Sequence, residues 1–581
     1  MKKLFCFIVL MTWLIFPQNP SIKTNGKKTD FNTSASETYL LDVNRLKMPL
    51  DNSGVLADAS VLGNSTATYD GQIAIYSAGF IISGYSGALM WANAVASASR
   101  IQDYQPGIVG SLPSDPKNLI YVVSVNDPPF GTSWNEWINA VQLGADFYDG
   151  NNDGIYNPID LNSNGVWDPN EDKPDILGDV TTYTVYNDAV TSNLRRFSDV
   201  QPQGIEIRQT LFAYANSSNS TLENTIFVRY KIINKGTVVP QMDSVYFCFW
   251  ADPDVGNADD DLVGCDTILN AGYVYHTVAD ILFGTAAPTV LTTVLQGPYY
   301  YKAGETFIDI NGNNIFDLGI DTPIDTAYNR KGSLLGFDVL PGAANHNMTS
   351  FAHYMQSHPT QGDPNTRFEA RNYLIGNNKN GDLIDPCTWD FGSVINTNCS
   401  TINPHYMYSG NPVQNVGWLN IVKTDQRTLV NSGPFVLKEN EPVVVMGAFI
   451  VGRKDDPLTS LSEGKRITSY VRSFYKSNFG QYPLGTGKEN NIQINSFELS
   501  QNYPNPFNPV TTINYQLPVA GHATLKIFDV LGKEVSTLVN EIKTGGKYSV
   551  EFDGSQLSSG VYFYELRSGN FASVKKLLLM K

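Results

Sequence analysis

The sequence predicts a mainly β protein of several domains: a β-sandwich body with one late helix, followed by a C-terminal immunoglobulin-like β-sandwich. Aromatic residues make up 12% of the chain and charged residues only 17%, and Gly, Pro, Asn and Thr are frequent. This mixture favours strands and turns over helices. Short apolar segments alternate with Gly, Pro and Asp turns along most of the chain. The length of 581 residues allows about two to four domains.

Residues 1–20 are predicted to be a signal peptide. Lys2 and Lys3 precede an apolar run from Leu4 to Phe16, which has the length of a signal-peptide core and is short for a bilayer span. Small residues are missing from the usual cleavage positions, so a retained anchor is the alternative. No other long apolar run exists, and the mature chain is expected to be soluble after crossing the inner membrane. Residues 21–50 are polar and predict a loose lead-in.

The sequence predicts two β-rich regions in the body, residues 51–200 and residues 201–480. In the second region, apolar residues at 226, 228, 230 and 232 alternate with the residues between them, and a turn at 234–236 follows. Residues 245–250, 434–437 and 443–451 read as further strands.

One helix is predicted near the end of the body. Residues 460–463 (SLSE) have the pattern of a capping box. Apolar residues then recur at helical spacing; they are Ile467, Tyr470, Val471, Phe474 and Tyr475. Residues 481–496 are rich in Gly, Asn and Lys and predict a linker to the last domain.

The net charge of −16 argues against a nucleic-acid partner, because phosphate backbones are bound by Lys and Arg. An acidic surface suits solubility in calcium-rich water outside the cell.

Four cysteines remain if Cys6 is removed with the signal peptide, and they allow three pairings. We expect Cys248–Cys265 and Cys387–Cys399, because each pair closes a short segment rich in loops. Each would stabilise the fold by roughly 3 kcal/mol in the chain-entropy model. The alternative is a set of four buried free thiols.

Residues 497–581 read as a small β-sandwich. The opening prolines exclude a helix, and several strands follow at spacings of about 8–12 residues with Gly-rich turns between them. This segment resembles the type A C-terminal sorting domain of the type IX (Por) secretion system. The resemblance is carried by residues 501–509 (QNYPNPFNP), 525–535 (LKIFDVLGKEV), 559–566 (SGVYFYEL) and the Lys575-Lys576 pair. It implies the type IX machinery as a partner and a place outside a Gram-negative cell, secreted or on its surface. The alternative is an unrelated immunoglobulin-like module.

The body is also similar to uncharacterised secreted proteins that carry the same tail. The shared segments are 204–210 (GIEIRQT), 228–236 (VRYKIINKG), 250–256 (WADPDVG) and 260–266 (DDLVGCD). That family implies a compartment and no activity.

Two consecutive segments, residues 149–160 and 160–171, have the D-x-[DN]-x-[DN]-G-x5-[DE] spacing of EF-hand loops. In such a loop, alternate side-chain oxygens face one hard cation, Gly allows the bend and the twelfth residue supplies an acid. The spacing therefore predicts a structural Ca²⁺ cofactor in the body. The predicted ligands are Asp149, Asn151, Asp153, Asp160, Asn162, Asn164, Asp168 and Glu171.

Prolines around these loops exclude long flanking helices, so the loops resemble the helix-poor calcium repeats of dockerin or thrombospondin type 3 modules. A third, degraded copy begins at Asp309, with Asn314 where Gly is expected and Ile320 at the twelfth position. The alternative for all three is a series of Asx turns that need no ion. If calcium binds, the affinity should lie in the 0.1 mM to millimolar range of extracellular modules.

Six aspartates cluster between residues 252 and 266 and suggest a second site. Their carboxylates repel one another unless solvated or neutralised by a cation. Three readings stay open: a further calcium site, a pair of acids in a hydrolase cleft, and an exposed acidic loop held by a disulfide. The aspartates are Asp252, Asp254, Asp259, Asp260, Asp261 and Asp266.

No His-Glu-x-x-His or Gly-x-Ser-x-Gly motif is present, and no catalytic residue is assigned. The leading hypothesis is a calcium-stabilised β-rich surface protein with an adhesive or structural role, which contacts surface polysaccharide or other cell-surface material. The competing hypothesis is a secreted hydrolase that acts on polysaccharide. Two carboxylates roughly 5–10 Å apart in an aromatic cleft would favour the enzyme, and carboxylates converging on one point would favour a metal.

Overall fold

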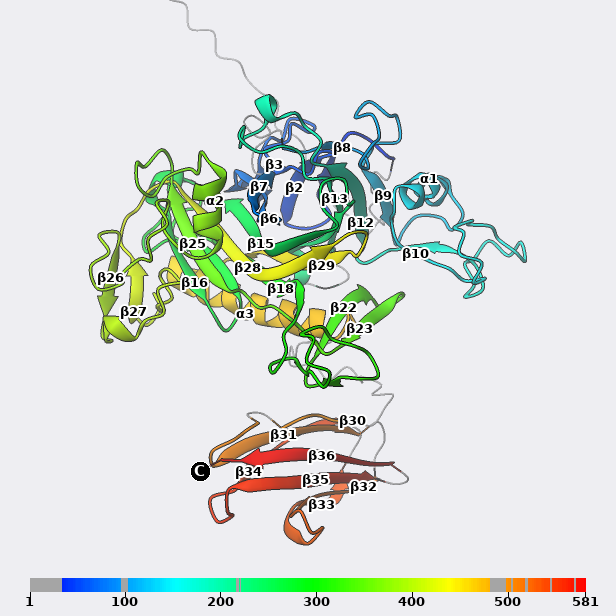
Figure 1. Ribbon diagram of the computed structural model, residues 1–581, viewed down its shortest axis with the longest axis vertical. Coiled ribbons are helices and arrows are strands. Elements are labelled where there is room, and N and C mark those ends of the chain that lie inside the picture. The colour runs from blue at the N-terminus through cyan, green and yellow to red at the C-terminus, as the bar shows by residue number, and fades with distance from the viewer. Residues whose placement is uncertain are drawn as a thin grey trace, which may run out of the picture. The chain divides into compact units, whose positions relative to one another are not determined.

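A computed structural model describes most of the chain (Figure 1). The described residues are 34–95, 103–215, 219, 221–480, 498–502, 505–517, 521–543, 546–568 and 571–580. The predicted signal peptide, Cys6, the first part of the lead-in and the linker 481–496 lie outside these residues. The chain divides into two compact units, one ending at Tyr482 and one beginning at Pro483.

Ten strands of the body form one antiparallel sheet. They are β1 (Thr38–Leu41), β2 (Leu46–Asp51), β3 (Leu56–Ala57), β4 (Ala67–Tyr69), β5 (Gln72–Ile75), β6 (Ser77–Ser86), β7 (Leu89–Val95), β15 (Gln241–Asp252), β25 (Ser350–Met355) and β28 (Gln426–Lys438). Their order is β25-β28-β15-β6-β3-β2-β4-β5, with β1 beside β2 and β7 beside β6.

Nine further strands form a second antiparallel sheet. They are β8 (Gln105–Pro106), β9 (Tyr121–Ser124), β12 (Val180–Asn187), β13 (Ile205–Ala213), β14 (Thr225–Asn234), β16 (Leu262–Asp266), β17 (Ala271–Tyr275), β18 (Thr289–Gln296) and β29 (Val443–Gly452). Their order is β16-β17-β18-β29-β14-β13-β12-β8, with β9 beside β12.

Short hairpins and helices complete the body. The small strands are β10 (Phe147–Tyr148), β11 (Lys173–Pro174), β19 (Tyr299–Tyr301), β20 (Phe307–Ile308), β21 (Thr322–Pro323), β22 (Thr326–Gly332), β23 (Gly336–Pro341), β24 (Ala343–Asn345), β26 (Gly392–Ile395) and β27 (Gly417–Asn420). The α-helices are α1 (Thr132–Gln142), α2 (Arg367–Leu374) and α3 (Pro457–Lys476), and the 3-10 turns are η1 (Ser192–Leu194), η2 (Leu222–Asn224), η3 (Ala258–Asp260) and η4 (Cys399–Thr401). None of the described helices is both long enough and apolar enough to cross a membrane.

The two large sheets pack face to face around one core. The ring of Phe80 on β6 lies 5.3 Å from that of Phe247 on β15 and 5.2 Å from that of Tyr230 on β14 of the other sheet. Such contacts between aromatic rings stabilise a sandwich core beyond the area they bury. The body is thus a β-sandwich, and the predicted mainly β class is confirmed.

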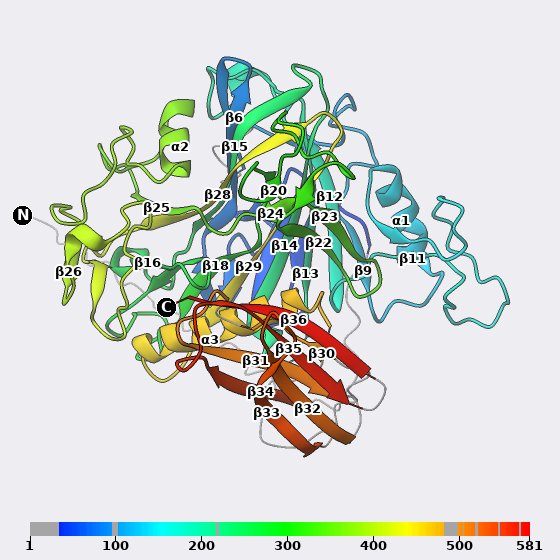
Figure 2. The same cartoon turned by 60° about the horizontal axis from the view of Figure 1, so that its bottom comes forward.

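Strand β29 shows why the second sheet is apolar on both faces. Val445 and Phe449 belong to the core between the sheets, whereas Met446, Ala448 and Ile450 belong to a second core on the opposite face. Because successive side chains of a strand point to opposite faces, both faces of β29 must be covered. Helix α3 covers the outer face; it contacts β18 and β29 and lies across them in Figure 2.

The helix begins earlier than predicted. Asp456 is the N-cap, accepting from the backbone N–H groups of Leu458 and Thr459, and Pro457 takes the first helical position. The predicted capping box at residues 460–463 is wrong, because Ser460 is already buried inside the helix. Proline at the first turn and an aspartate cap were the stronger start signal. The five predicted apolar residues of the helix are all buried.

Gly452→Ala is expected to lower the free energy of unfolding by about 1–3 kcal/mol, as overpacking of a core does. A Cβ at Gly452 would lie 2.2 Å from the Gly464 nitrogen and 2.5 Å from the Ser460 carbonyl oxygen of α3. Both are backbone atoms, so relief requires the helix to move. Without the clash, alanine would stabilise the strand slightly relative to glycine. The clash and the strand propensity thus predict changes of opposite sign in the free energy of unfolding. Urea denaturation measures the effect; the exposed helix variant Ser469→Ala should stay within about 0.5 kcal/mol of wild type, and an equally small loss for Gly452→Ala would contradict the close contact.

The body forms one compact unit, although the sequence divides it at residue 200. Strand β6 pairs with β15, and β12 pairs with β13, so neighbours in both sheets come from the two sides of that boundary. The loose lead-in expected for residues 21–50 is wrong from Thr38 onward, because β1 and β2 belong to the first sheet and Leu46 and Met48 are fully buried. Helices α1 and α2 were not predicted.

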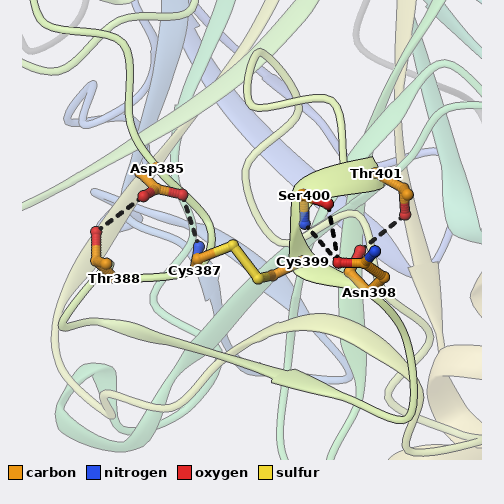
Figure 3. The surroundings of a disulfide bond; sticks show 7 residues. All are labelled: Asp385, Cys387, Thr388, Asn398, Cys399, Ser400 and Thr401. Carbon is orange, nitrogen blue, oxygen red and sulfur yellow. Dashed lines mark hydrogen bonds between the residues drawn. A yellow bond between two sulfur atoms is a disulfide. The ribbon is translucent and has the colours of Figure 1, made fainter.

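One of the two predicted disulfides is present. Cys387 and Cys399 are bonded, with their Cα atoms 5.1 Å apart (Figure 3). Each lies beside a side-chain turn: Asp385 accepts from the Cys387 N–H, and Asn398 accepts from the Ser400 N–H.

The predicted Cys248–Cys265 disulfide is absent, and that prediction is wrong: both cysteines are buried free thiols. Cys248 lies on β15 of the first sheet and Cys265 on β16 of the second. The two cysteines therefore belong to different layers of the sandwich, although they are close in sequence. The Cys265 thiol is 3.3 Å from the Met407 carbonyl oxygen, to which it donates. Burial raises the pKa of both thiols well above the ordinary value.

The C-terminal unit is a smaller β-sandwich of two sheets, ordered β30-β31-β34 and β33-β32-β35-β36, around a core of its own. Its opening motif has a structural role: Phe507 lies in the core, Asn505 accepts from the Leu578 N–H, and the Tyr564 hydroxyl accepts from the Asn502 N–H. The strands are β30 (Glu498–Leu499), β31 (Val510–Leu517), β32 (Gly521–Phe528), β33 (Glu534–Lys543), β34 (Gly546–Asp553), β35 (Gly560–Ser568) and β36 (Phe571–Leu579).

Candidate functional site

The two predicted calcium loops lie between β10 and β11, which pair with each other and close the segment at its base. The segment projects from the body beside α1 (Figure 1). Asp149, Asp153 and Asn164 are half-buried or exposed, whereas Glu171 and its neighbour Asp172 are each only 2% exposed. Two adjacent buried acids at the base of exposed loops are the feature that requires an explanation.

The second loop, residues 160–171, brings its predicted ligands together. The Gly165 N–H donates to Asp160 Oδ2 (2.7 Å), and the Asn164 N–H donates to Asn162 Oδ1 (3.0 Å). The side-chain amides of Asn162 and Asn164 both donate to Asp168 Oδ2, at 2.8 and 2.9 Å. Three predicted ligands therefore contact one another, with the amide nitrogens of the two asparagines facing Asp168.

Glu171 closes this loop with both carboxylate oxygens. Its Oε1 accepts from the Leu161 N–H (2.7 Å) and its Oε2 from the Asp168 N–H (2.9 Å). These donors are the second and ninth residues of the loop. The predicted twelfth-position acid thus holds the loop at both ends.

The first loop has the same construction with a different closing acid. The Gly154 N–H donates to Asp149 Oδ2 (2.8 Å), and the Asp153 N–H donates to Asn151 Oδ1 (3.0 Å). Its second and ninth residues, however, donate to Asp172, at 3.1 and 2.7 Å. Asp172 therefore closes this loop, and the predicted twelfth residue, Asp160, serves the second loop.

The third copy, which begins at Asp309, follows the same plan. The N–H groups of its second and ninth residues, Ile310 and Asp317, donate to Asp321 at 2.9 and 2.7 Å. Asp321 thus stands one position after Ile320, which the sequence pattern placed at the closing position. Asn311 and Asn313 both donate to Asp317 Oδ2 at 2.7 and 2.8 Å, as their counterparts do in the second loop.

The backbone of the three loops agrees at the residues that bend it. The fourth residues have φ of 59°, 59° and 73°, and the sixth residues have φ of 76°, 75° and 60°. In the third loop Asn314 takes the left-handed conformation that Gly takes in the other two, which asparagine tolerates better than other non-glycine residues. The substitution that made this copy look degraded is therefore compatible with the loop.

The acidic cluster of residues 252–266 divides into two groups. Asp252 and Asp254 join Asp425, with one oxygen of each within 4.8 Å of the others, while Asp260 and Asp261 join His276 in the same way. Asp266 pairs with Lys465 at 3.0 Å, and Asp259 is exposed outside both groups. Sequence reasoning missed Asp425 because it is distant along the chain, and missed His276 because it lies beyond the aspartate cluster and belongs to no local motif.

The first group lies in a cavity of about 880 Å³ at the end of β15. Arg427 spans two of its acids, with contacts of 2.9 Å to Asp252 and 2.7 Å to Asp425. The lining also includes the aromatic residues Tyr76, Trp250 and Tyr354.

Burial shifts Asp252 and Asp254 toward the protonated form. Loss of solvent is the largest cause in each case; it raises the pKa of Asp254 to about 7, with Asp425 adding to the shift, and raises the pKa of Asp252 well above its usual range, against the opposing charge of Arg427. Asp252 is 3% exposed, so the expectation of a fully exposed acidic loop does not describe it. A bound cation would reverse these shifts, because positive charge favours carboxylates.

Comparisons with known proteins identify one part of the chain. Residues 501–580 match the secretion system C-terminal sorting domain. The comparison with curated proteins gave no match.

Two solved structures show weak likeness. A polysaccharide lyase aligns at 8% identity over 64% of this chain and 34% of its own, with a TM-score of 0.19. The dimeric latent PorU of Porphyromonas gingivalis aligns at 9% identity over 69% of this chain and 31% of its own, with a TM-score of 0.13. The chain thus spans about a third of each, and scores this low establish no common fold.

Proposed function

We propose a calcium-stabilised structural or adhesive role for a protein whose sorting domain makes it a cargo of the type IX secretion machinery. The C-terminal domain directs the chain out of a Gram-negative cell, so the protein is secreted and works at the cell surface. Surface polysaccharide or other cell-surface material is the partner we propose for it.

The observation that carries the calcium proposal is the closing acid shared by three loops. Asx turns alone explain the short contacts within each loop, but they do not require an additional acid. In each loop, a carboxylate from outside the turn binds the N–H groups of the second and ninth residues. An acid at this place completes an oxygen cage in EF-hand-type loops. We propose Asp172 and Asp321 as closing residues beside Glu171.

Calcium is expected to raise the melting temperature of the whole chain by a few degrees, and EDTA should remove the increase. With a Kd of about 0.1 mM and about 2 mM free calcium, each loop would gain about 2 kcal/mol by mass action. Differential scanning calorimetry in calcium and in EDTA measures this shift.

Asp160→Asn should reduce the calcium-dependent shift, since it removes a charge at the first position of the second loop while keeping one acceptor oxygen. Asp338→Asn is the matched control; it removes an aspartate that is 47% exposed and pairs with Lys331 on the β22–β23 hairpin. The control should retain the full shift. Identical melting of wild-type protein in calcium and in EDTA would refute the proposal.

A polysaccharide hydrolase is the second candidate, favoured by the aromatic-lined cavity and the pKa of Asp254 near 7. One oxygen of each acid in this cavity lies within 4.8 Å of the others, whereas a glycosidase needs two carboxyl groups roughly 5–10 Å apart. The convergence of three carboxylates, rather than two, favours an ion over an acid–base pair. Release of reducing ends from a polysaccharide panel, abolished by Asp254→Asn, would reverse this preference.

A further inference from the structure

The second acidic group lies at the edge of the nine-stranded sheet. His276 follows β17, Asp261 precedes β16, and Asp260 ends η3. The side chains of His276 and Asp261 are fully buried, and that of Asp260 is 23% exposed. Among the described residues, no Lys or Arg forms an ion pair with either aspartate.

The imidazole of His276 is oriented by the backbone. Its Nε2 lies 3.0 Å from the Val255 carbonyl oxygen, which can only accept, so Nε2 carries a proton. In the neutral ring, Nδ1 then holds a lone pair. This atom is buried without a hydrogen-bond partner and lies 3.4 Å from Asp260 Oδ1.

Two acceptor atoms of this group, Asp260 Oδ1 and His276 Nδ1, face each other at 3.4 Å, and neither has a hydrogen-bond partner. Asp260 Oδ1, Asp261 Oδ1 and His276 Nδ1 are all buried and lack hydrogen-bond partners. Asp261 is fully buried, and its Oδ1 lies 3.5 Å from the ring Nε2. Acceptors that face one another repel, and the Asp261 carboxylate, which accepts from the Val255 N–H at 3.4 Å but has no Lys or Arg partner, is unfavourable as a buried charge. A positive charge among them would remove both penalties.

We propose that Asp260, Asp261 and His276 bind a divalent transition-metal ion such as Zn²⁺ or Mn²⁺. One imidazole and two carboxylates suit these ions, whereas a histidine ligand is foreign to calcium cages. Two ligand atoms that each lie about 2.1 Å from a tetrahedral ion are about 3.4 Å apart. His276 Nδ1 and Asp260 Oδ1 have this separation, 3.4 Å. Metal-binding histidines usually donate their other ring N–H to a carboxylate or a backbone carbonyl, which holds the ring in place. The His276 Nε2–H makes this bond to the Val255 carbonyl oxygen.

The ion has a structural role. It joins η3 and the start of β16 to the end of β17, and so holds the 252–261 loop that contributes Asp252 and Asp254 to the neighbouring cavity. The site is separate from the calcium loops in both position and ligand chemistry.

The test is metal titration of the tag-free full chain after stripping with a chelator. Co²⁺ serves as the probe because its visible absorption reports coordination, and Zn²⁺ is then added in competition, all in millimolar calcium. We expect one tightly held equivalent of Co²⁺, displaced by Zn²⁺. His276→Gln and Asp260→Asn should weaken binding at least about 100-fold, since outer contacts alone change affinity 10–100-fold.

Asp160→Asn, in the second calcium loop, is the matched control and should bind Co²⁺ as wild type does. Asp260→Asn decides the question if His276→Gln fails to fold, because the Asp260 side chain is 23% exposed whereas that of His276 is fully buried. Absence of Co²⁺ and Zn²⁺ binding by wild type would overturn the proposal. Unchanged affinity in Asp260→Asn would do the same, whether or not calcium stabilises the loops.

Discussion

Replacing Arg195 with Met is expected to lower the free energy of unfolding by about 3–5 kcal/mol, because it leaves buried carboxylates without their cation. The Arg195 side chain is fully buried between Asp103 and Asp188, at 3.7 and 3.9 Å. Its Nη1 also donates to the carbonyl oxygens of Asp188 (2.6 Å) and Val190 (3.3 Å). The guanidinium thus organises the segment that leads from β12 to β13.

Burial raises the pKa of both aspartates, and the charge of Arg195 is the main opposing influence. Methionine fills a similar volume but offers neither charge nor donors. Equilibrium denaturation in urea measures the loss. Arg466→Met is the control, since Arg466 is half-exposed and pairs with Glu463 one helical turn away; it should cost less than about 1 kcal/mol. A loss of similar size for both variants would show that the buried cluster is not specifically stabilising.

Removal of residues 498–581 should abolish delivery of the protein to the cell surface. These residues contain the matched sorting domain and have a core separate from that of the body. The truncated chain is expected to accumulate inside the outer membrane, protected from protease added to intact cells. Cell fractionation and surface proteolysis measure the change.

The deletion must leave the body folded for this result to be informative. The body is a separate compact unit, so its melting temperature should not change. A reporter protein that carries residues 481–581 and a signal peptide provides the converse control, because the tail should export it. Surface display of the truncated chain would show that the address lies elsewhere.

Local patterns predicted the parts of the fold that depend on local spacing. In β14, residues 226–232 alternate between the main core and the opposite face, as their period of two requires. The loop motif likewise placed Asp149, Asn162 and Asp168 in tight turns, which the hydrogen bonds of the two loops show, while their role as calcium ligands stays a prediction.

Contacts that depend on the path of the chain were not predictable. Asp172 replaces Asp160 as the closing acid of the first loop, and Asp321 is one position out of register. Asp425, just before β28, and His276, just after β17, join the acidic groups from outside the 252–266 segment. The Cys248–Cys265 prediction failed for the same reason, because proximity in sequence says nothing about which layer a strand joins. The compositional reading of residues 21–50 overlooked an alternation of apolar residues in β2 that a period-two search would detect.

The adjacency of Glu171 and Asp172 links the first two loops mechanically. Glu171 and Asp172, the closing acids of the two loops, are joined by one peptide bond, so an ion bound as proposed in one loop would also position the acid of the other. The second ion would then meet a partly ordered cage and lose less conformational entropy on binding. Uptake by this pair would be cooperative, with a Hill coefficient above one, whereas the loop closed by Asp321 would titrate independently.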